Sequence, residues 1–560
     1  MGARLGTRVV AIVAVVAAAA ASALVTTGEA VAGSSGGPFD PGINSPAALA
    51  GPNCDAERKQ VKFPYFSAPA CVKPWKVGAA NGGATAQGVT KRAVKVVVLH
   101  NTPVPGPPTV SANFLIDQAT GQNGTPEDAI LDFAAVYETV YETWGRKIEY
   151  TFVQSGGTDE AAQRADAIKV GAMKPFAVLD IASTEGSSGG GPIFEREVAR
   201  TGVPIVIPAA PDDPQNPYIP YLLPVAEFIG KALVGKPAEF AGQEDLRSKE
   251  RAFAVVYQGS SLGVEGMDVN LFKKELAKYG GETVIDLEYS PGSSSDERTA
   301  KAQEQAPTLA TRLKQSGATT VVLFVDPRAM LPALLTQMTQ QEFFPENIIT
   351  TFGFQDITFY GRIFDQEQWK HAFGPIWFFP FVQGYSDPIK AAFQWYWGAD
   401  KGTFCTCAFA MVTGIYSGIH LAGPKLTQKT FAGAFSMSKP RGGYYSDSVT
   451  TFEAAPVKPG KPNLAGRGYA LGWWDPDTEG PTQLQGVVGQ GVTQYLDGGQ
   501  RYVYGHFPKY GKNEQPAFFD RTAGTTIYQL DSIPPNDVLP DYACEDCPSS
   551  GGGAAPAAEG

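Results

Sequence analysis

The chain has few histidines, no clustered basic residues and no long apolar run beyond its N-terminus. Only 4 histidines occur among 560 residues, which leaves few candidate catalytic bases. The 45 Lys and Arg are scattered and are outnumbered by 56 Asp and Glu, for a net charge of -11. Because recognition of nucleic-acid phosphates requires a concentrated basic surface, nucleic acid is excluded as a partner. The acidity is typical of a secreted protein kept soluble by its charge.

The N-terminus carries the order of segments that marks a signal peptide. Arg4 and Arg8 precede an apolar run over residues 9–25, and small residues at positions 30–32 precede Gly33. This pattern predicts a signal peptide over residues 1–32 and a secreted protein of the periplasm or cell envelope. The run is too short and alanine-rich for a stable transmembrane anchor, so we expect no stable membrane insertion. No cysteine directly follows it, which argues against a lipid anchor there.

The cysteines indicate disulfides. Six cysteines in an exported chain favour structural cross-links, and Cys54 and Cys71 bracket a short proline-rich segment and are expected to pair. The remaining disulfide candidates are Cys405, Cys407, Cys544 and Cys547, whose connectivity is left open. No histidine lies near either of these later pairs, and an all-cysteine zinc site usually uses two C-x-x-C motifs. We therefore predict no metal site.

Strand and helix patterns alternate along most of the chain. Residues 33–92 show no sustained periodicity of apolar residues, which predicts an extended arm held by its disulfide. Expected strands then follow at 93–99, 148–153, 177–181 and 203–207, with helices between them, the first capped by Thr125 with Pro126 at its first position. The alternation restarts in a second unit, with a helix expected near residues 226–233, strands at 252–257, 283–287, 320–325 and 348–352, and a helix at 308–315 between two of these strands. Strict alternation of this kind specifies parallel sheets covered on both faces.

The predicted fold class is α/β, with two doubly wound parallel-sheet lobes, a hinge and a central cleft. The first lobe takes residues 93–220 and return helices within 381–450, and the second takes 221–380. Residues 451–543 are expected to return to the second lobe and form a C-terminal extension, and 544–560 a disordered tail.

In sequence the chain resembles the type 1 periplasmic binding protein superfamily, in particular the branched-chain amino acid type substrate-binding proteins of ABC importers. The resemblance spans about residues 93–450 and is carried by VKVVVL, IASTEGSSGGGPIF, TGVPIVIPAA, AFAVVYQGSSLGVEG and VVLFVDPRAM in that order. It implies a protein without enzyme activity or cofactor that captures a small polar or amphiphilic ligand, such as an amino acid, amide or carboxylate. It also implies an ABC importer permease as partner.

The resemblance also implies ligand-binding positions. In the first lobe, Ser183 and Thr184 would offer hydroxyls and backbone N–H groups to a ligand carboxylate. The other implied ligand-binding positions are Ala209, Ala210, Ser260, Leu262, Asp326, Phe354 and Asp356. Two positions depart from the amino-acid binders, which commonly have an aromatic residue where Leu262 stands and a Glu near Gln355. Asp326 or Asp356 could replace that Glu in holding an ammonium group.

An alternative prediction comes from the sequence Gly-Ser-Ser-Leu-Gly at residues 259–263, a G-x-S-x-G between an expected strand and helix. As a secreted serine hydrolase, the protein would use Ser261 as nucleophile, Asp326 or Asp356 as the orienting acid, and His371 or His420 as base. The motif is weak evidence for a hydrolase in a chain with 63 glycines. The binding-protein interpretation requires the same loop.

Overall fold

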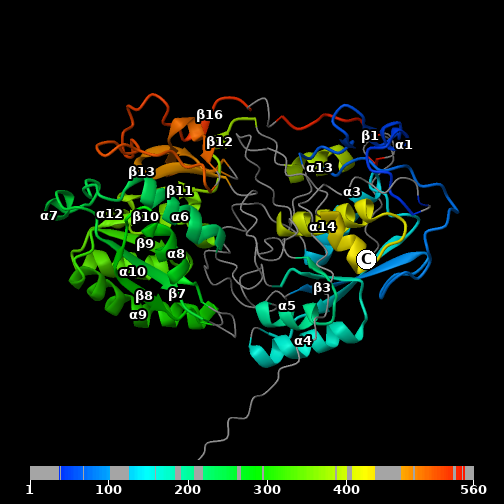
Figure 1. Ribbon diagram of the computed structural model, residues 1–560, viewed down its shortest axis with the longest axis horizontal. Coiled ribbons are helices and arrows are strands. Elements are labelled where there is room, and N and C mark those ends of the chain that lie inside the picture. Colours follow the sequence, from blue (N-terminus) through cyan, green and yellow to red (C-terminus); the bar gives the residue numbers. More distant parts are fainter. Residues whose placement is uncertain are drawn as a thin grey trace, which may run out of the picture.

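The computed structural model is an α/β protein of two units that lie side by side (Figure 1). It describes residues 37–548 apart from 38, 67, 101–124, 158, 183–190, 207–218, 261–265, 293–294, 385–387, 400–405, 436–467, 484–485, 503, 534–537 and 545–546. The predicted signal peptide and the low-complexity tail beyond residue 548 lie outside the described residues. The α/β class with parallel sheets is confirmed.

In the described residues, the first unit is built on a 4-stranded parallel sheet of order β4-β3-β5-β6. Its strands are β3 (Ala93–His100), β4 (Lys147–Gln154), β5 (Ala177–Asp180) and β6 (Ile205–Val206), at the predicted places. Side chains of β3 alternate between two apolar clusters, with Val94, Val96 and Val98 in one and Val97 and Leu99 in the other. Burial on both faces explains why this strand is a continuous β-branched run.

Helices cover both faces of this sheet. One face packs against α3 (Pro126–Glu138), α13 (Pro388–Trp397), α14 (Thr406–Ala422) and α15 (Gln428–Phe435), and the other against α4 (Glu160–Ala172) and α5 (Pro192–Ala199). α3 begins at a capping box in which the Thr125 side chain accepts from the Asp128 N–H and the Asp128 carboxylate accepts from the Thr125 N–H. Phe133 stacks on Phe393 of α13 at 4.8 Å, so the later helices return to the first unit.

The second unit contains a sheet of order β14-β13-β11-β10-β9-β7-β8, with β15 paired to β13. Its parallel strands are β7 (Phe253–Gln258), β8 (Thr283–Tyr289), β9 (Thr320–Phe324), β10 (Glu346–Ile348) and β11 (Ala372–Ile376). Antiparallel β13 (Tyr469–Pro481), β14 (Val488–Tyr495) and β15 (Arg501–Tyr502) extend it. The sheet is therefore mixed, whereas the alternation predicted a purely parallel one. The glycine-rich late segment adds a hairpin, which needs no crossover helix.

The helices of the second unit show where the sequence pattern misplaced helix ends. α6 (Ile219–Ala232) and α8 (Val269–Ala277) cover one face, and α9 (Ser295–Gln315) and α10 (Met330–Gln340) cover the other. The patterns placed the starts of α6 and α9 near residues 226 and 308, just after Pro224 and Pro307. Both prolines lie inside the helices. An internal proline costs a hydrogen bond, which packing of the surrounding apolar residues offsets here.

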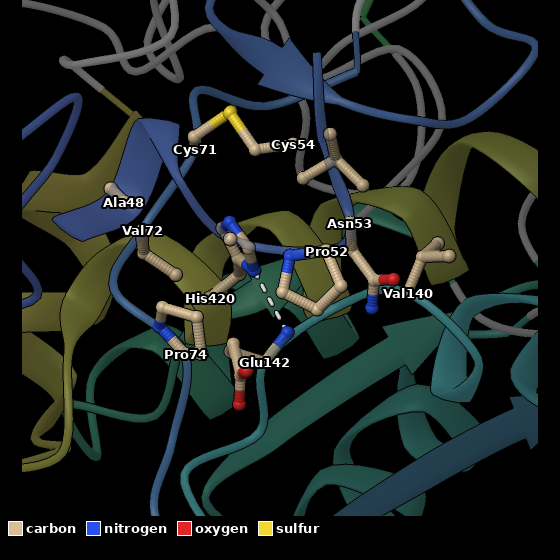
Figure 2. Close-up of a pocket in the computed structure, with 12 residues that line it drawn as sticks. Ala48, Pro52, Asn53, Cys54, Cys71, Val72, Pro74, Val140, Glu142 and His420 are labelled. Carbon is tan, nitrogen blue, oxygen red and sulfur yellow. Dashed lines mark hydrogen bonds between the residues drawn. A yellow bond between two sulfur atoms is a disulfide. The ribbon is translucent and has the colours of Figure 1, made fainter. Parts of the chain in front are cut away.

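The N-terminal arm packs on the first unit and carries the predicted disulfide (Figure 2). It contains α1 (Pro46–Leu49), β1 (Cys54–Asp55) and β2 (Gln60–Val61), and the bond between Cys54 and Cys71 confirms the expected pairing. Arg146 donates to the carbonyls of Asn81, Thr90 and Pro424. These contacts hold the arm against the body of the first unit.

The C-terminal extension reaches both units. β16 (Gln529–Leu530) pairs in parallel with β12 (Phe381–Val382), and farther along the hydroxyl of Tyr542 donates to Asp55 in the arm at 2.8 Å. In Figure 1 the red segment runs from β16 toward β1.

The later cysteines and the short elements complete the fold. Cys544 and Cys547 form a disulfide, while Cys405 lies outside the described residues. The remaining short elements are α7 (Glu244–Arg247), η1 (Phe352–Phe354), α11 (Thr358–Ile363), α12 (Gln366–Trp369) and η3 (Asp497–Gly499). Within the described residues, none of the helices has the length and apolar content to cross a bilayer.

Candidate ligand-binding site

The connections between the two units meet one edge of the second sheet. The chain enters this unit at α6, where Tyr221 packs on Phe352, just after β10, with ring centroids 5.6 Å apart. It leaves after β11 for α13 and returns at β13, whose Ala470 pairs with Ile376 at the carboxyl end of β11. The chain also leaves the first unit from the carboxyl end of β6. The carboxyl ends of the parallel strands are thus on the side where the units connect, which is where open α/β sheets bind ligands.

Asp326 follows β9 at this edge and is held by Arg328. Its carboxylate accepts from Arg328 Nε at 3.0 Å, from Nη2 at 3.2 Å and from the Arg328 backbone N–H at 2.9 Å. The hydroxyl of Tyr289, from β8, accepts from the Asp326 N–H at 3.0 Å. Burial opposes ionisation, but the charge and hydrogen bonds of Arg328 outweigh it and hold the pKa of Asp326 below its usual value. A ligand approaching this loop would therefore meet a guanidinium already paired with a carboxylate.

Asp356 ties the loop after β10 to the end of β11. One carboxylate oxygen accepts from the backbone N–H groups of Trp377 at 2.6 Å and Phe378 at 3.0 Å. The other, Oδ1, is buried and has no hydrogen-bond partner among the described residues. Burial raises the pKa of Asp356 to about 6. The side chain points back into the fold and fixes the loop.

The backbone of this loop adopts a left-handed conformation at two positions. Thr351 has φ 62°, which is unusual for a β-branched residue, and Gly353 also has φ 62°. A Cβ on Gly353 would lie 2.6 Å from Cδ of Pro327, so the loops after β9 and β10 are in close contact. The side chain of Gln355 donates to the carbonyl of Leu323 at 2.9 Å and accepts from the N–H of Thr350 at 3.3 Å. Strain held by such contacts is typical of functional loops.

Ser260 closes the base of the loop after β7. Its hydroxyl accepts from the N–H of Gly266 at 2.9 Å, across residues 261–265, which lie outside the described residues. A Cβ on Gly259 would lie 2.3 Å from Oε1 of Glu288, so a larger residue at this position would displace the Glu288 side chain. The carboxyl ends of β7, β8, β9 and β10 are neighbours in the sheet, which brings the predicted positions Ser260, Asp326 and Asp356 to a single edge.

The corresponding edge of the first unit carries acidic groups. Asp180 ends β5, is fully buried and accepts from the N–H of Gly191 at 3.1 Å at the start of α5. Desolvation and then the charge of Asp180 raise the pKa of Glu195. At the end of β3, His100 lies 3.3 Å from Glu127. Among the described residues, this edge therefore brings two buried carboxyl groups together, those of Asp180 and Glu195.

Several predicted positions lie outside the described residues. They are Ser183, Thr184, Ala209, Ala210 and Leu262, together with the side chain of Phe354. Their ligand contacts stay predictions. Arg328 was missed by the sequence reasoning, although the D-P-R sequence directly after a buried strand was a usable signal for it.

The histidines proposed for the hydrolase alternative lie away from the β7 loop that contains Ser261. His371 directly precedes β11, so it lies at the amino edge of the sheet, whereas Ser261 follows the carboxyl end of the parallel strand β7. The 5 residues of β11 alone span about 17 Å. His420 is on α14 of the first unit, where its ring contacts Glu142 and Ala70. Both histidines lie away from Ser260, the last described residue before Ser261, and Ser261 itself lies outside the described residues.

A small cavity lies under the arm, away from the sheet edge. It measures about 30 Å³, room for a single water, and is lined in part by Cys54, Val72, Glu142 and His420 (Figure 2). A cavity of this size belongs to the packing between arm and first unit and does not accommodate an organic solute.

No protein-family model matches the chain, and no curated protein matches it. Solved structures that resemble it include solute-binding proteins of ABC transporters. One, from Rhodopseudomonas palustris BisB5 in complex with 3,4-dihydroxybenzoic acid, is 10% identical, with 75% of this chain and 99% of that chain covered and a TM-score of 0.43. A possible leucine/isoleucine/valine-binding protein from Rhodopirellula baltica SH 1 is 11% identical over 68% of this chain and 94% of that chain, with a TM-score of 0.41. These values do not place the chain in a family.

Proposed function

We propose that this protein is an extracytoplasmic solute-binding protein that captures a small polar or amphiphilic organic molecule between its two units for an ABC importer. The observation that carries the proposal is the convergence of the inter-unit connections on the carboxyl edge of the second sheet. That edge also holds the strained loop at residues 351–353 and the paired charges of Asp326 and Arg328. Ligands of open α/β folds bind at such an edge.

Binding would proceed by closure of the two units around the ligand. The solute first contacts one unit, and contacts with the other then stabilise the closed form by its higher affinity for the solute. No covalent step is required. In the first unit, Ser183 and Thr184 remain our candidates for the polar head of the ligand, because they follow β5 directly. A permease would then recognise the closed form.

A thermal-shift screen of the purified mature chain tests the proposal. The panel contains amino acids, their amides, small carboxylates and aromatic acids. A ligand at about 100 times its Kd adds about 2.7 kcal/mol, or roughly 5–10 °C for a unit of this size. We expect at least one class to give such a shift, and isothermal titration calorimetry should then give a single site. If every member leaves the melting temperature unchanged, the proposal is wrong.

Two variants separate the classes of function. Replacing Ser183 and Thr184 together with Ala should raise the Kd about tenfold or more while the unliganded melting temperature stays within a few degrees. Early melting with unchanged affinity would mean that the pair only caps the helix. Ester hydrolysis by the wild type and by Ser261→Ala is measured in parallel. Turnover that is present in the wild type and lost in Ser261→Ala would support the hydrolase instead.

A further inference from the structure

The C-terminal segment, residues 525–548, is anchored at one end on the second unit. Ile527 accepts from the N–H of Tyr495 in β14 at 2.6 Å and donates to the carbonyl of Tyr495 at 2.9 Å. β16 then pairs with β12, and the N–H of Gln383 extends this pairing by donating to the carbonyl of Leu530 at 3.0 Å. β12 lies between β11 of the second unit and α13 of the first. This end of the segment is therefore fixed beside a chain connection between the two units.

The other end of the segment is anchored on the first unit. The hydroxyl of Tyr542 donates to Oδ2 of Asp55 at 2.8 Å. The acceptor is itself held in place, because its Oδ1 accepts from the N–H groups of Glu57 at 3.0 Å and Arg58 at 2.9 Å. The residue before Asp55 belongs to the disulfide of the arm, and the arm packs on the first unit. The segment thus ends on a part of the first unit that is already cross-linked.

The length of chain between the two anchors limits how far the units can separate. Leu530 and Tyr542 are 12 positions apart. A fully extended chain spans about 3.3–3.6 Å per residue, so these two residues cannot move more than about 40 Å apart. Figure 1 shows the red segment running from β16 of the second unit toward β1 in the arm. As long as Tyr542 stays on Asp55, the chain between the anchors sets an upper bound on the opening of the units.

We propose that the C-terminal segment is a brace across the hinge, which limits how far the two units open. In the order of the described elements, the chain has already passed between the units before α6, after β11 and before β13. The contact of Tyr542 with Asp55 adds a further tie, and because a hydrogen bond closes it, this tie can form and break. Restricting the open form leaves fewer states to be lost when the units close. That consequence for solute capture rests on the proposed function, whereas the brace itself requires no solute.

Hydrogen exchange of the unliganded mature protein tests the brace at the hinge, away from the contact that is changed. Tyr542→Phe removes the hydroxyl, and Tyr542→Asp places a second carboxylate against Asp55. We expect amide exchange at residues 377–384, which include β12, to become about two- to tenfold faster in Tyr542→Phe, as loss of one hydrogen bond implies, and faster still in Tyr542→Asp. Small-angle X-ray scattering should give a larger radius of gyration for Tyr542→Asp than for the wild type.

Two further variants show whether the effect comes from this contact. Tyr528→Phe is the matched control, because Tyr528 lies in the same segment and its hydroxyl makes no hydrogen bond among the described residues. It should keep the exchange and scattering of the wild type. Adding Asp55→Asn to Tyr542→Asp removes the repulsion and should return exchange to the level of Tyr542→Phe.

Three results would overturn the brace. They are faster exchange confined to residues 538–548, an unchanged radius of gyration in Tyr542→Asp, and an equal effect of Tyr528→Phe. None of these measurements uses a solute, so the brace can fail while solute binding holds. Failure of the ligand screen, in turn, would refute the proposed function and leave the brace standing.

Discussion

Protonation of His420 should destabilise the first unit at acidic pH. The ring is 2% exposed, and its Nδ1 accepts from the N–H of Glu142 at 2.9 Å (Figure 2). Its Nε2 lies 3.1 Å from the carbonyl of Ala70 in the arm. The neutral ring with its proton on Nε2 satisfies both contacts. A second proton, on Nδ1, would face another N–H group in a buried place. Burial accordingly lowers the pKa of His420 from 6.5 to about 4.

The size of the effect follows from linkage. In the unfolded chain His420 takes up a proton near pH 6.5, whereas in the folded chain it does so near pH 4. The contribution of the neutral ring to the free energy of unfolding is therefore complete above pH 6.5 and is lost as the pH falls to 4. Each unit of difference corresponds to about 1.4 kcal/mol, which gives a loss of about 3 kcal/mol over this window. Burial raises the pKa of the neighbouring Glu142, which acts in the opposite direction. A variant that removes only the imidazole isolates the contribution of His420.

Urea unfolding of wild type and His420→Gln between pH 4 and 7 measures this contribution. Glutamine can accept from Glu142 and donate to Ala70 but does not titrate, so its free energy of unfolding should fall less steeply with acid. The difference between the two slopes should reach about 1.4 kcal/mol per pH unit within the window. His506→Gln, at an exposed site, should retain the wild-type slope. Parallel curves for wild type and His420→Gln would refute the reasoning.

Two further predictions concern the second unit. Glu346 and Arg251 form an ion pair at 2.7 Å with both side chains fully buried, so Glu346→Gln should lower the free energy of unfolding by about 3–5 kcal/mol in urea denaturation. The exposed Glu282→Gln is its control, and equal midpoints would contradict the prediction. Gly353→Ala should cost about 1–3 kcal/mol more than Gly317→Ala, since both have positive φ but only a Cβ on Gly353 meets Pro327, 2.6 Å away. Equal losses in the two alanine variants would show that the loops after β9 and β10 can separate freely.

Local sequence patterns predicted most of the parallel strands and the first helix well, but they placed β10 at residues 348–352 in place of Glu346–Ile348 and predicted no strand at β11. The β-branched run that became β3 and the Thr125 cap of α3 depend on neighbours within a few residues, so their signals are complete in the sequence. The starts of α6 and α9 were misplaced because Pro224 and Pro307 are ordinarily boundaries. Whether a helix continues through a proline depends on how the rest of its surface is packed, which a local pattern does not contain.

The candidate site likewise combines features that the local sequence predicted with features that only tertiary packing determined. Sequence alone placed Asp326 and Asp356 after strands of the second unit, and the structure brings both to the edge where the connections meet. Only the structure showed that Asp326 is engaged by Arg328, and that Asp356 turns inward to the backbone of Trp377 and Phe378.

The amino-acid sequence by itself determined an α/β protein with an arm closed by a disulfide, because periodicity, caps and close cysteine spacing act over short stretches of chain. The tertiary structure decided which charges face solvent and which face each other. Arg251 meets Glu346 and His420 meets Ala70 across 95 and 350 positions of sequence. Such pairings depend on the relative placement of whole elements, and that placement is fixed by the burial of apolar faces throughout the fold.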